Sequence, residues 1–510
     1  MGILTLAEDR PTPPSVYNWR IYVLAVVASC GSNMIGYTSA FIGTTITLDS
    51  FKKEFGIDTK TVEERNLISE NIVSLFIAGA FFGALLTYVL SHWVGRKWCL
   101  AIASATFTLG AGLQCGADSS TGLGILYAGR VLSGLGTGFA SNIIPIYISE
   151  LAPPAIRGRL VGLYELGWQI GGLVGFWINY GVQKHMPESH QQWIVPFAVQ
   201  IIPSGLLFLG TLWLRESPRW LFLKDRRTQA MENLCWIRQL PPTDLYITEE
   251  PFQALKDRPN MMWRLFLGCM LFFWQNGSGI NAINYYSPTV FSSIGVQHDT
   301  VNVMTGIFGV VKAVMTFVWL LFLVDQLGRR SFCLLVVSPV PSALVLPLSC
   351  SFYLWTAVYT PTWNGTPWVI NSVSLAFPTI FHHLISVKEF FDPSFRSLAQ
   401  ACTTASNWLF NFLVSRFTEQ MFAAMGYGVY MFFATLSFFA FIFAFFLIPE
   451  TSGIPLEQVY RLFKIKPIWK ADKILKEQLK QEEQQFRSDV KGEVSQSENL
   501  EDVSDKRGEV

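Results

Sequence analysis

Two ionisable residues, Glu165 and Lys312, lie inside long apolar stretches of this 510-residue sequence. An ionised side chain at the centre of a membrane helix costs about 2.5–3.5 kcal/mol, so such residues usually serve a function. Lys312 is suited to attract a carboxylate, and Glu165 to accept hydrogen bonds from hydroxyl groups or to balance the lysine. The alternative is a mutually neutralising pair that contacts no ligand.

Amide side chains gather in two further apolar stretches, four in the first and two in the second. An amide both donates and accepts hydrogen bonds, so a set of amides can replace the water shell of a hydroxylated solute between aromatic walls. The competing interpretation for any one amide is a hydrogen bond between helices. The amides are Gln275, Asn276, Asn281, Asn284, Asn407 and Asn411. The residues predicted to bind substrate are Gln275, Asn276, Asn281, Asn284, Glu165, Lys312, Trp408 and Asn411.

The sequence offers little other chemistry. No polar segment pairs a nucleophile with a base or contains a nucleotide-binding loop, and the eight cysteines are scattered singly. His382 and His383 are adjacent, so on a helix they point apart and do not form a metal site. The 38 basic residues nearly balance the 37 acidic ones, which leaves no surplus for nucleic acid. We predict neither an enzyme nor a cofactor, metal or nucleic-acid partner.

The elements that position these residues are apolar runs of about 20 residues, the length that crosses a bilayer. Hydrophobic residues make up 51% of the chain and charged residues 15%, and the mean hydropathy is +0.34. Backbone groups in lipid must bond within their own segment, so each span is expected to be a helix. The predicted spans are 21–46, 69–91, 98–117, 122–146, 160–182, 194–214, 265–289, 301–324, 332–355, 368–386, 398–420 and 428–448. The fold class is therefore an all-α membrane protein with twelve transmembrane helices.

Basic residues in the short loops all fall on one side of these spans, which the positive-inside rule makes cytoplasmic. They are Arg96, Lys97, Arg157, Arg159, Arg219 to Arg227, Arg329 and Arg330. An even number of spans then places both termini in the cytosol, with the plasma membrane as the expected location. The predicted divisions are a cytoplasmic segment 1–20, a six-helix bundle 21–214, a cytoplasmic loop 215–264, a second bundle 265–448 and a largely disordered tail 449–510.

The two bundles repeat each other. Gly95-Arg96-Lys97 returns as Gly328-Arg329-Arg330, displaced by 233 positions, and the pair Glu150 and Arg157 returns as Glu389 and Arg396, displaced by 239. Such repeats are typical of transporters with a substrate site between the halves.

These landmarks resemble the sugar porter branch of the major facilitator superfamily, from about Val16 to Val459. The matching stretches include GRVLSGLGTGFAS (129–141), IYISELAPPAIRGRL (146–160), ESPRWL (216–221), QNGSGINAINYYSP (275–288) and PETSGIPLEQV (449–459). Within that branch, EDRPTPPSVYNWRIYVLA at the start and LVGLYELGWQIGGLVGFWINYG (160–181) look most like fungal quinate permeases. The resemblance implies the two-bundle major facilitator fold, transport by alternating access and an amide-lined cavity.

The resemblance also implies a gate of charged residues at the cytoplasmic helix ends. The candidates are Arg96, Arg130, Glu150, Arg157, Asp325, Arg329, Glu389 and Arg396. Some of them are alternatively simple positive-inside anchors. One departure is His92, which replaces the acid that relatives carry before the first GRK stretch.

Two other departures bear on energy coupling. Proton-coupled relatives carry an acid after Gly-Tyr in the first span, whereas this chain has Thr38, which cannot titrate. The tenth span (372–390) lacks the Gly-Pro-x-x-Trp type of stretch. Either Glu165 takes the coupling role and protons are a partner, or the protein is a uniporter, or transport has decayed.

Glu165 occupies a position where sugar-transporting relatives usually have Gln, and together with Lys312 it favours a hydroxylated ring acid such as quinate as substrate. A hexose or polyol facilitator is the alternative within the class. A nutrient sensor that keeps the transporter fold without transporting is the alternative from another class.

Overall fold

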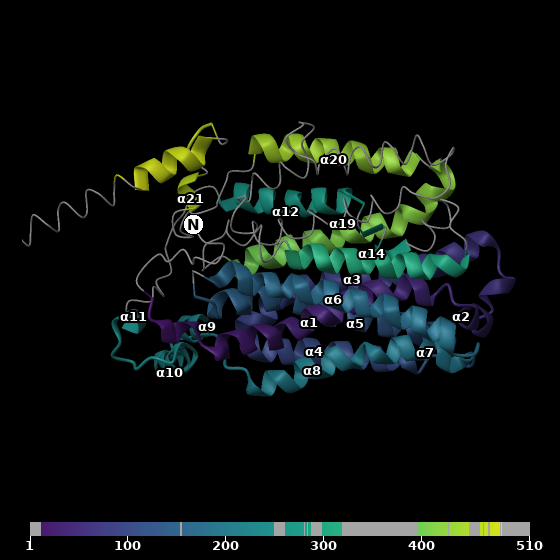
Figure 1. The fold of residues 1–510 in the computed structure, drawn as a ribbon, viewed down its shortest axis with the longest axis horizontal. Helices are drawn as coiled ribbons and strands as arrows, with labels where there is room; N and C mark the ends of the chain where they lie inside the picture. The colour runs from purple at the N-terminus through teal and green to yellow at the C-terminus, as the bar shows by residue number, and fades with distance from the viewer. Residues whose placement is uncertain are drawn as a thin grey trace, which may run out of the picture.

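The computed structural model of the chain describes residues 12–153, 156–248, 261–279, 281–282, 284–286, 298–318, 396–426, 428–447, 459–462, 464–467, 470–479 and 481. These residues form helices joined by short turns and contain no strand. The long helices lie side by side along one axis (Figure 1).

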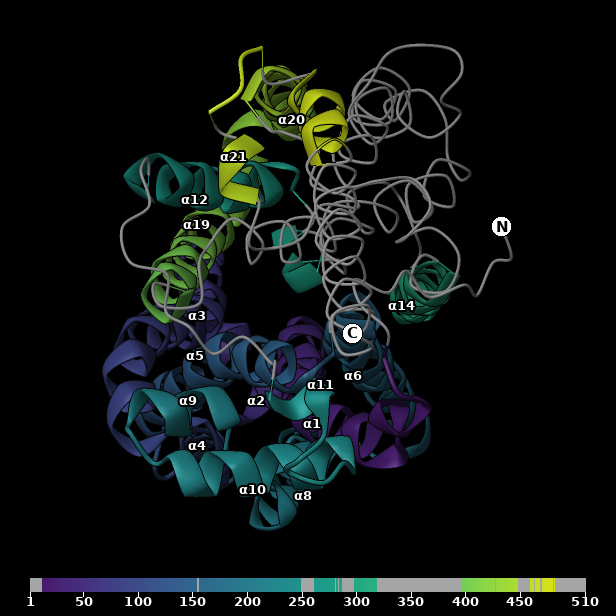
Figure 2. The ribbon, with the colours of Figure 1, turned by 90° about the vertical axis from the view of Figure 1, so that its left-hand side faces the viewer.

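The first half of the molecule comprises the helices up to residue 213. They are η1 (Pro14–Tyr17), α1 (Trp19–Thr45), α2 (Asp49–Glu54), η2 (Ile57–Thr59), α3 (Val62–Val94), α4 (Arg96–Cys115), α5 (Leu123–Leu151), α6 (Arg157–His185), α7 (His190–Val199) and α8 (Ile201–Trp213). Helix α1 packs along α6, and α5 packs along both α3 and α4. Three short helices follow at one end of the bundle (Figure 2): α9 (Pro218–Leu223), α10 (Arg227–Arg238) and α11 (Leu245–Thr248).

The second half is described over four long helices, α12 (Met261–Gly277), α14 (His298–Val318), α19 (Arg396–Met425) and α20 (Gly428–Leu447), and the short α21 (Val459–Leu462). Two seams join the halves: α19 packs along α3, and α14 packs along α6 (Figure 2). The cavity described below and the ion pair between Glu70 and Arg416 lie along these seams.

Ten of the twelve predicted spans overlap described helices, although the ends of 265–289 and 301–324 lie outside the described residues, as do the whole spans 332–355 and 368–386. By length and composition, five stretches within the described residues are able to cross a membrane: Pro14–Thr45, Val62–Val94, Arg96–Cys115, Leu123–Leu151 and His190–Trp213. The predicted span 194–214 is divided between α7 and α8. Pro203 explains the division, because it has no amide hydrogen and its ring clashes with the carbonyl of Val199.

Local sequence determines where α3 begins and ends. Thr61 and Glu64 form a capping box, in which Glu64 Oε2 accepts from the Thr61 amide at 3.0 Å. This cap extends α3 seven residues beyond the apolar stretch that begins at 69. The helix ends at Gly95, whose φ of +99° suits glycine and turns the chain directly into α4.

Glycines bring α3 and α5 into backbone contact. A Cβ added to Gly134 would lie 2.1 Å from the Phe76 carbonyl oxygen, and one added to Gly138 would lie 2.2 Å from that of Ala80. The glycine-rich stretch 134–138 is thus a helix-packing surface inside α5.

We therefore expect Gly138→Ala to destabilise the protein by about 1–3 kcal/mol, because the added methyl group forces α3 and α5 apart. The thermal unfolding midpoint of the purified protein in detergent measures this effect. Gly124→Ala in the same helix is the matched control, since no atom lies within 4 Å of its added Cβ. Equal midpoints for the two variants would contradict the packing assignment.

Candidate solute-binding site and polar gate

A small pocket lies between α1, α6 and α14, at the seam between the two halves. Its polar lining includes Ser39 of α1, Gln169 of α6, Asn284 and Lys312. The Lys312 ammonium is buried and donates to Asn284 Oδ1 at 2.9 Å, and it lies 5.4 Å from the centre of the Phe308 ring. The cavity thus presents a cation and two amides beside apolar and aromatic walls.

Glu165 lies one helical turn before Gln169 on α6. Gln169 Nε2 donates to Glu165 Oε1 at 3.1 Å, and the charge of Glu165 acts on Lys312. The structure therefore brings together Glu165, Lys312 and Asn284, three of the residues that the sequence predicted to bind substrate. Gln169 was missed, although its position four residues after Glu165 puts it on the same helix face.

Three amides form a chain between α12 and α19. Asn281 Nδ2 donates to Asn276 Oδ1 at 2.6 Å, and Asn276 Nδ2 donates to Asn407 Oδ1 at 2.9 Å. The bond between Asn276 and Asn407 joins two helices, as in the competing interpretation offered above, whereas Asn281 bonds within its own segment. A role in substrate binding remains a prediction for them.

Gln275 and Asn411 are buried and only partly satisfied. Asn411 Nδ2 donates to the Tyr285 hydroxyl at 3.4 Å, whereas Asn411 Oδ1 and Gln275 Oε1 have no hydrogen-bond partner among the described residues. A buried acceptor without a donor costs about 1–3 kcal/mol. Both side chains are therefore suited to accept hydrogen bonds from solute hydroxyls.

Trp408 connects α19 to three helices of the first half. Its ring stacks on Trp168 of α6 at 6.4 Å between centroids and meets the Phe76 ring edge-on at 6.4 Å. Its Nε1 donates to Ser141 Oγ of α5 at 3.0 Å. The tryptophan thus forms an aromatic and polar bridge between the halves.

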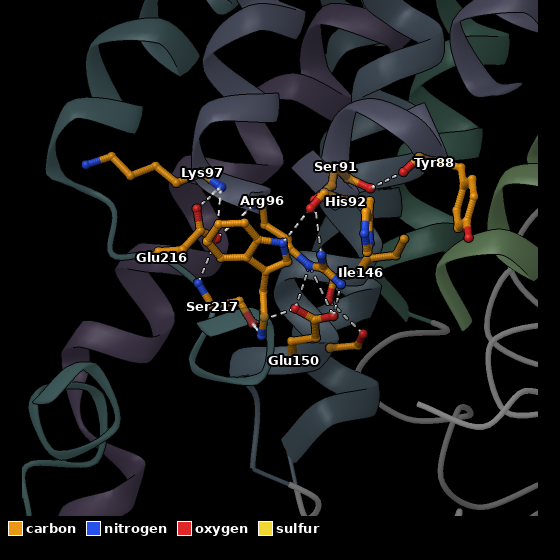
Figure 3. A network of polar contacts seen from close by, with 11 residues as sticks. Tyr88, Ser91, His92, Arg96, Lys97, Ile146, Glu150, Glu216 and Ser217 are labelled. Carbon is orange, nitrogen blue, oxygen red and sulfur yellow. Dashed lines mark hydrogen bonds and ion pairs between the residues drawn. The ribbon is translucent and has the colours of Figure 1, made fainter. Parts of the chain in front are cut away.

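A polar network lies where α3, α4, α5 and α9 meet (Figure 3). Arg96 Nη2 pairs with Glu150 Oε1 at 2.9 Å, and both side chains are less than a tenth exposed. Ser217 Oγ donates to Glu150 Oε2 at 2.5 Å. The described members belong to α4, α5 and the turn before α9, so this part of the network binds helices of the first half to one another.

Glu216 joins the same network through the backbone. Its carboxylate accepts from the amides of Arg96 at 2.8 Å, Lys97 at 3.2 Å and Ser217 at 2.9 Å (Figure 3). Two of these amides open α4, where unpaired N–H groups favour an anion. Burial raises the pKa of Glu216, and the backbone donors oppose that shift. In the sequence, Glu216 appeared only within the matching stretch 216–221, because hydrogen bonds to backbone amides leave no pattern of opposite charges.

Arg130 does not join that network. It precedes Glu150 by twenty residues of α5, roughly 30 Å along the helix axis, and therefore lies toward the opposite end of the bundle. Its Nε donates to the Ile72 carbonyl at 2.9 Å, and its guanidinium carbon lies 4.4 Å from the centre of the Phe76 ring. The expectation that Arg130 belongs to the cytoplasmic helix ends is wrong, because spacing along α5 separates it from Glu150.

The other gate candidates are not described at the level of side chains. Arg157 and Arg396 begin α6 and α19, and their side chains lie outside the described residues. Asp325, Arg329 and Glu389 also lie outside, as do His382 and His383. At His92, the position of the missing acid, the ring Nε2 lies 3.3 Å from Lys224 Nζ. Among the described residues no group of three His, Cys, Asp or Glu side chains could hold a metal ion.

A helical membrane fold with a polar pocket at the seam between two bundles is the architecture expected of a transporter. Structural comparison shows the same fold: the chain matches the major facilitator proton:xylose symporter XylE bound to 6-bromo-6-deoxy-D-glucose with a TM-score of 0.75 and 23% identity, over 86% of this chain and 99% of that one. A partially occluded inward-open form of the Escherichia coli protein matches with a TM-score of 0.70 and 24% identity, over 84% and 100%.

Sequence comparison identifies the family. The family described as "Sugar (and other) transporter" matches residues 24–463, and the chain belongs to it. A "Probable quinate permease" of Aspergillus flavus is 56% identical over 96% of this chain and 97% of its own length. A protein of the same description from Aspergillus terreus is 57% identical over 96% and 95%. The protein is therefore a membrane transporter of the sugar porter type and not an enzyme.

We expect Glu150→Gln to lower the stability of the protein by about 3–5 kcal/mol, because it leaves the buried Arg96 guanidinium without its counter-charge. The thermal unfolding midpoint in detergent reports the loss. Asp225→Asn is the matched control, since it removes an acid whose ion pair with Arg227 is almost fully exposed, and its midpoint should hardly move. A Glu150→Gln variant as stable as that control would contradict the structural role of the pair.

Proposed function

We propose that the protein transports a hydroxylated ring acid of the quinate type by alternating access. The observation that carries this proposal is the buried Lys312 in a cavity lined by helices of both halves. A buried ammonium offers a charge-assisted hydrogen bond to a carboxylate, which a neutral hexose cannot use. Relatives more than 55% identical to this chain are described as probable quinate permeases, which agrees with the same substrate class.

The groups around Lys312 match the rest of such a solute. Asn284 and Gln169 line the cavity and offer amide donors and acceptors to ring hydroxyls, and Glu165 accepts from Gln169 directly behind it. We propose that the carboxylate of the solute displaces Asn284 Oδ1 as the acceptor for Lys312 Nζ. Trp168 and Phe176 line the same cavity and would pack against the apolar faces of the ring.

For orientation, we propose a plasma-membrane protein with both termini, the loop 215–264 and the tail 449–510 in the cytosol, and bundles at 21–214 and 265–448. The support is the placement of basic residues in the short loops on one side. In this orientation the Arg96–Glu150 network lies at the cytoplasmic end of the first bundle. The lipid bilayer is then the partner of the outward-facing apolar side chains, and no nucleic acid takes part.

A facilitator for hexoses or polyols is the second candidate, and Thr38 is the observation that favours it. Thr38 Oγ1 donates to the Met34 carbonyl at 2.9 Å within α1, and a hydroxyl cannot take up or release a proton at physiological pH. A facilitator needs no proton site. A sensor that does not transport is the candidate from another class, and uptake measurements separate it from both.

The proposal is tested by uptake of radiolabelled quinate and glucose in transporter-deficient cells that express the full chain. We expect saturable quinate uptake that exceeds glucose uptake. Uptake of glucose alone would favour the facilitator, and no uptake of either solute despite surface expression would favour the sensor. A protonophore distinguishes coupled uptake, which collapses, from facilitated diffusion, which does not.

We further expect Lys312→Ala to weaken quinate uptake about ten- to hundredfold while affecting glucose uptake much less. A hydrogen bond to a charged group contributes about 1.5–3 kcal/mol, and only the acid makes it. The apparent KM for each solute, normalised to protein at the cell surface, gives the result. Lys184→Ala, which removes an exposed lysine at the end of α6, is the matched control. Equal losses for quinate and glucose would exclude charge recognition by Lys312.

A further inference from the structure

A second set of charged residues crosses the seam between α3 and α19. Arg416 Nη1 pairs with Glu70 Oε2 at 3.1 Å and donates to Asn71 Oδ1 at 3.0 Å. Gln420 Nε2 donates to the same Glu70 oxygen at 3.3 Å. Glu70 lies near the start of α3, whereas the Arg96 network lies beyond its end, so the two networks occupy opposite ends of the bundle.

The charges in this cluster do not balance. Glu419 lies on α19 three residues after Arg416 and next to Gln420, both of which contact Glu70, and the charge of Glu70 acts on it. Two carboxylates and one guanidinium therefore lie in this cluster. The Glu70 side chain is 1% exposed, and its Oε1 has no hydrogen-bond partner among the described residues. The same holds for Glu419 Oε2. A buried carboxylate without a counter-charge is strongly disfavoured and instead takes up a proton.

The described parts of the neighbouring elements supply no second cation to this cluster. Tyr127 of α5 bonds to Asn71, and Tyr286, which follows α12, donates to the Ser415 carbonyl at 2.8 Å. Arg130 of α5 is the next cation, but it faces the Phe76 ring and Tyr285, one turn further into the bundle. Among the described residues, the groups around the two acids are therefore Arg416, Asn71, Gln420 and two tyrosines.

We propose that Glu70 and Glu419 form a proton-binding site that links closure of the α3–α19 seam to pH. When the seam is closed, the two carboxylates share Arg416 and one bound proton. When α3 and α19 separate, water reaches both acids, and the proton is released. In the orientation proposed above, this end faces the cell exterior. The inference rests on the proposed transport function, because only a transporter needs the halves to separate there.

Hydrogen–deuterium exchange of the purified full chain in lipid nanodiscs tests the site without any solute. Exchange rates of amides in 62–72 and 412–426 are measured at acidic and neutral pH and corrected for the intrinsic pH dependence. We expect protection of these segments to fall on going to neutral pH, by up to about tenfold per pH unit, because closure binds one proton. In the Glu419→Gln variant one acid faces one cation, so the protection of the two segments against exchange should not change with pH. Glu70→Gln should behave in the same way.

Glu63→Gln is the matched control, because it changes an exposed acid in the first turn of α3 and should keep the wild-type pH dependence. Wild-type protection that does not vary with pH would overturn the proposal, and so would a Glu419→Gln variant that varies as the wild type does. Exchange of labelled quinate or glucose across vesicles, measured in parallel, tests the transport function separately. If neither solute exchanged across the vesicles while the protection of the seam still varied with pH, the transport function would be refuted and the proton-binding site would be supported.

Discussion

A charge that leaves water must find a partner, and this requirement organises the polar structure of the protein. Arg96 pairs with Glu150, Glu70 pairs with Arg416, and Lys312 donates to Asn284 near Glu165. In each case the partner comes from a different helix or from a segment distant in the chain. The packing of the helices is therefore what makes each buried charge tolerable, and each charge in turn restricts how the helices can pack.

Helices that share a buried charge must also approach closely, and small residues make this possible. Along α3 and α5, Gly79 and Gly134 let the two backbones touch, which aligns both helices over most of their length. One end of this rigid pair meets Arg96, and the other end carries Glu70. Movement of α3 at one end would therefore be transmitted to the other through a packed helix pair rather than through flexible loops.

The fold was largely predictable from the sequence, because a span must be apolar, long and helical. The errors arose where local chemistry extends or interrupts a span, as at the capping box of Thr61 and at Pro203 between α7 and α8. Glu165 and Lys312 stood out because they interrupt apolar runs. Glu70 and Arg416 lie near span ends, where charges are ordinary, so only their pairing across 346 positions distinguishes them. Likewise, counting residues along a helix would have separated Arg130 from Glu150, but the motif resemblance grouped them.

The two charged networks differ in what they join, and this difference suits alternating access. The described part of the Arg96 network connects helices of one half, so it can persist while the halves move. The Glu70–Arg416 pair connects the two halves and must break when they separate. Removing one partner of a buried pair costs several kcal/mol. Exposing both partners to water restores the hydration of each charge, so the net change in free energy when the pair opens is small. An ion pair at the end of a seam can thus stabilise the closed arrangement of the two helices. It can also separate at thermal energies, provided that water reaches both charges as the seam opens.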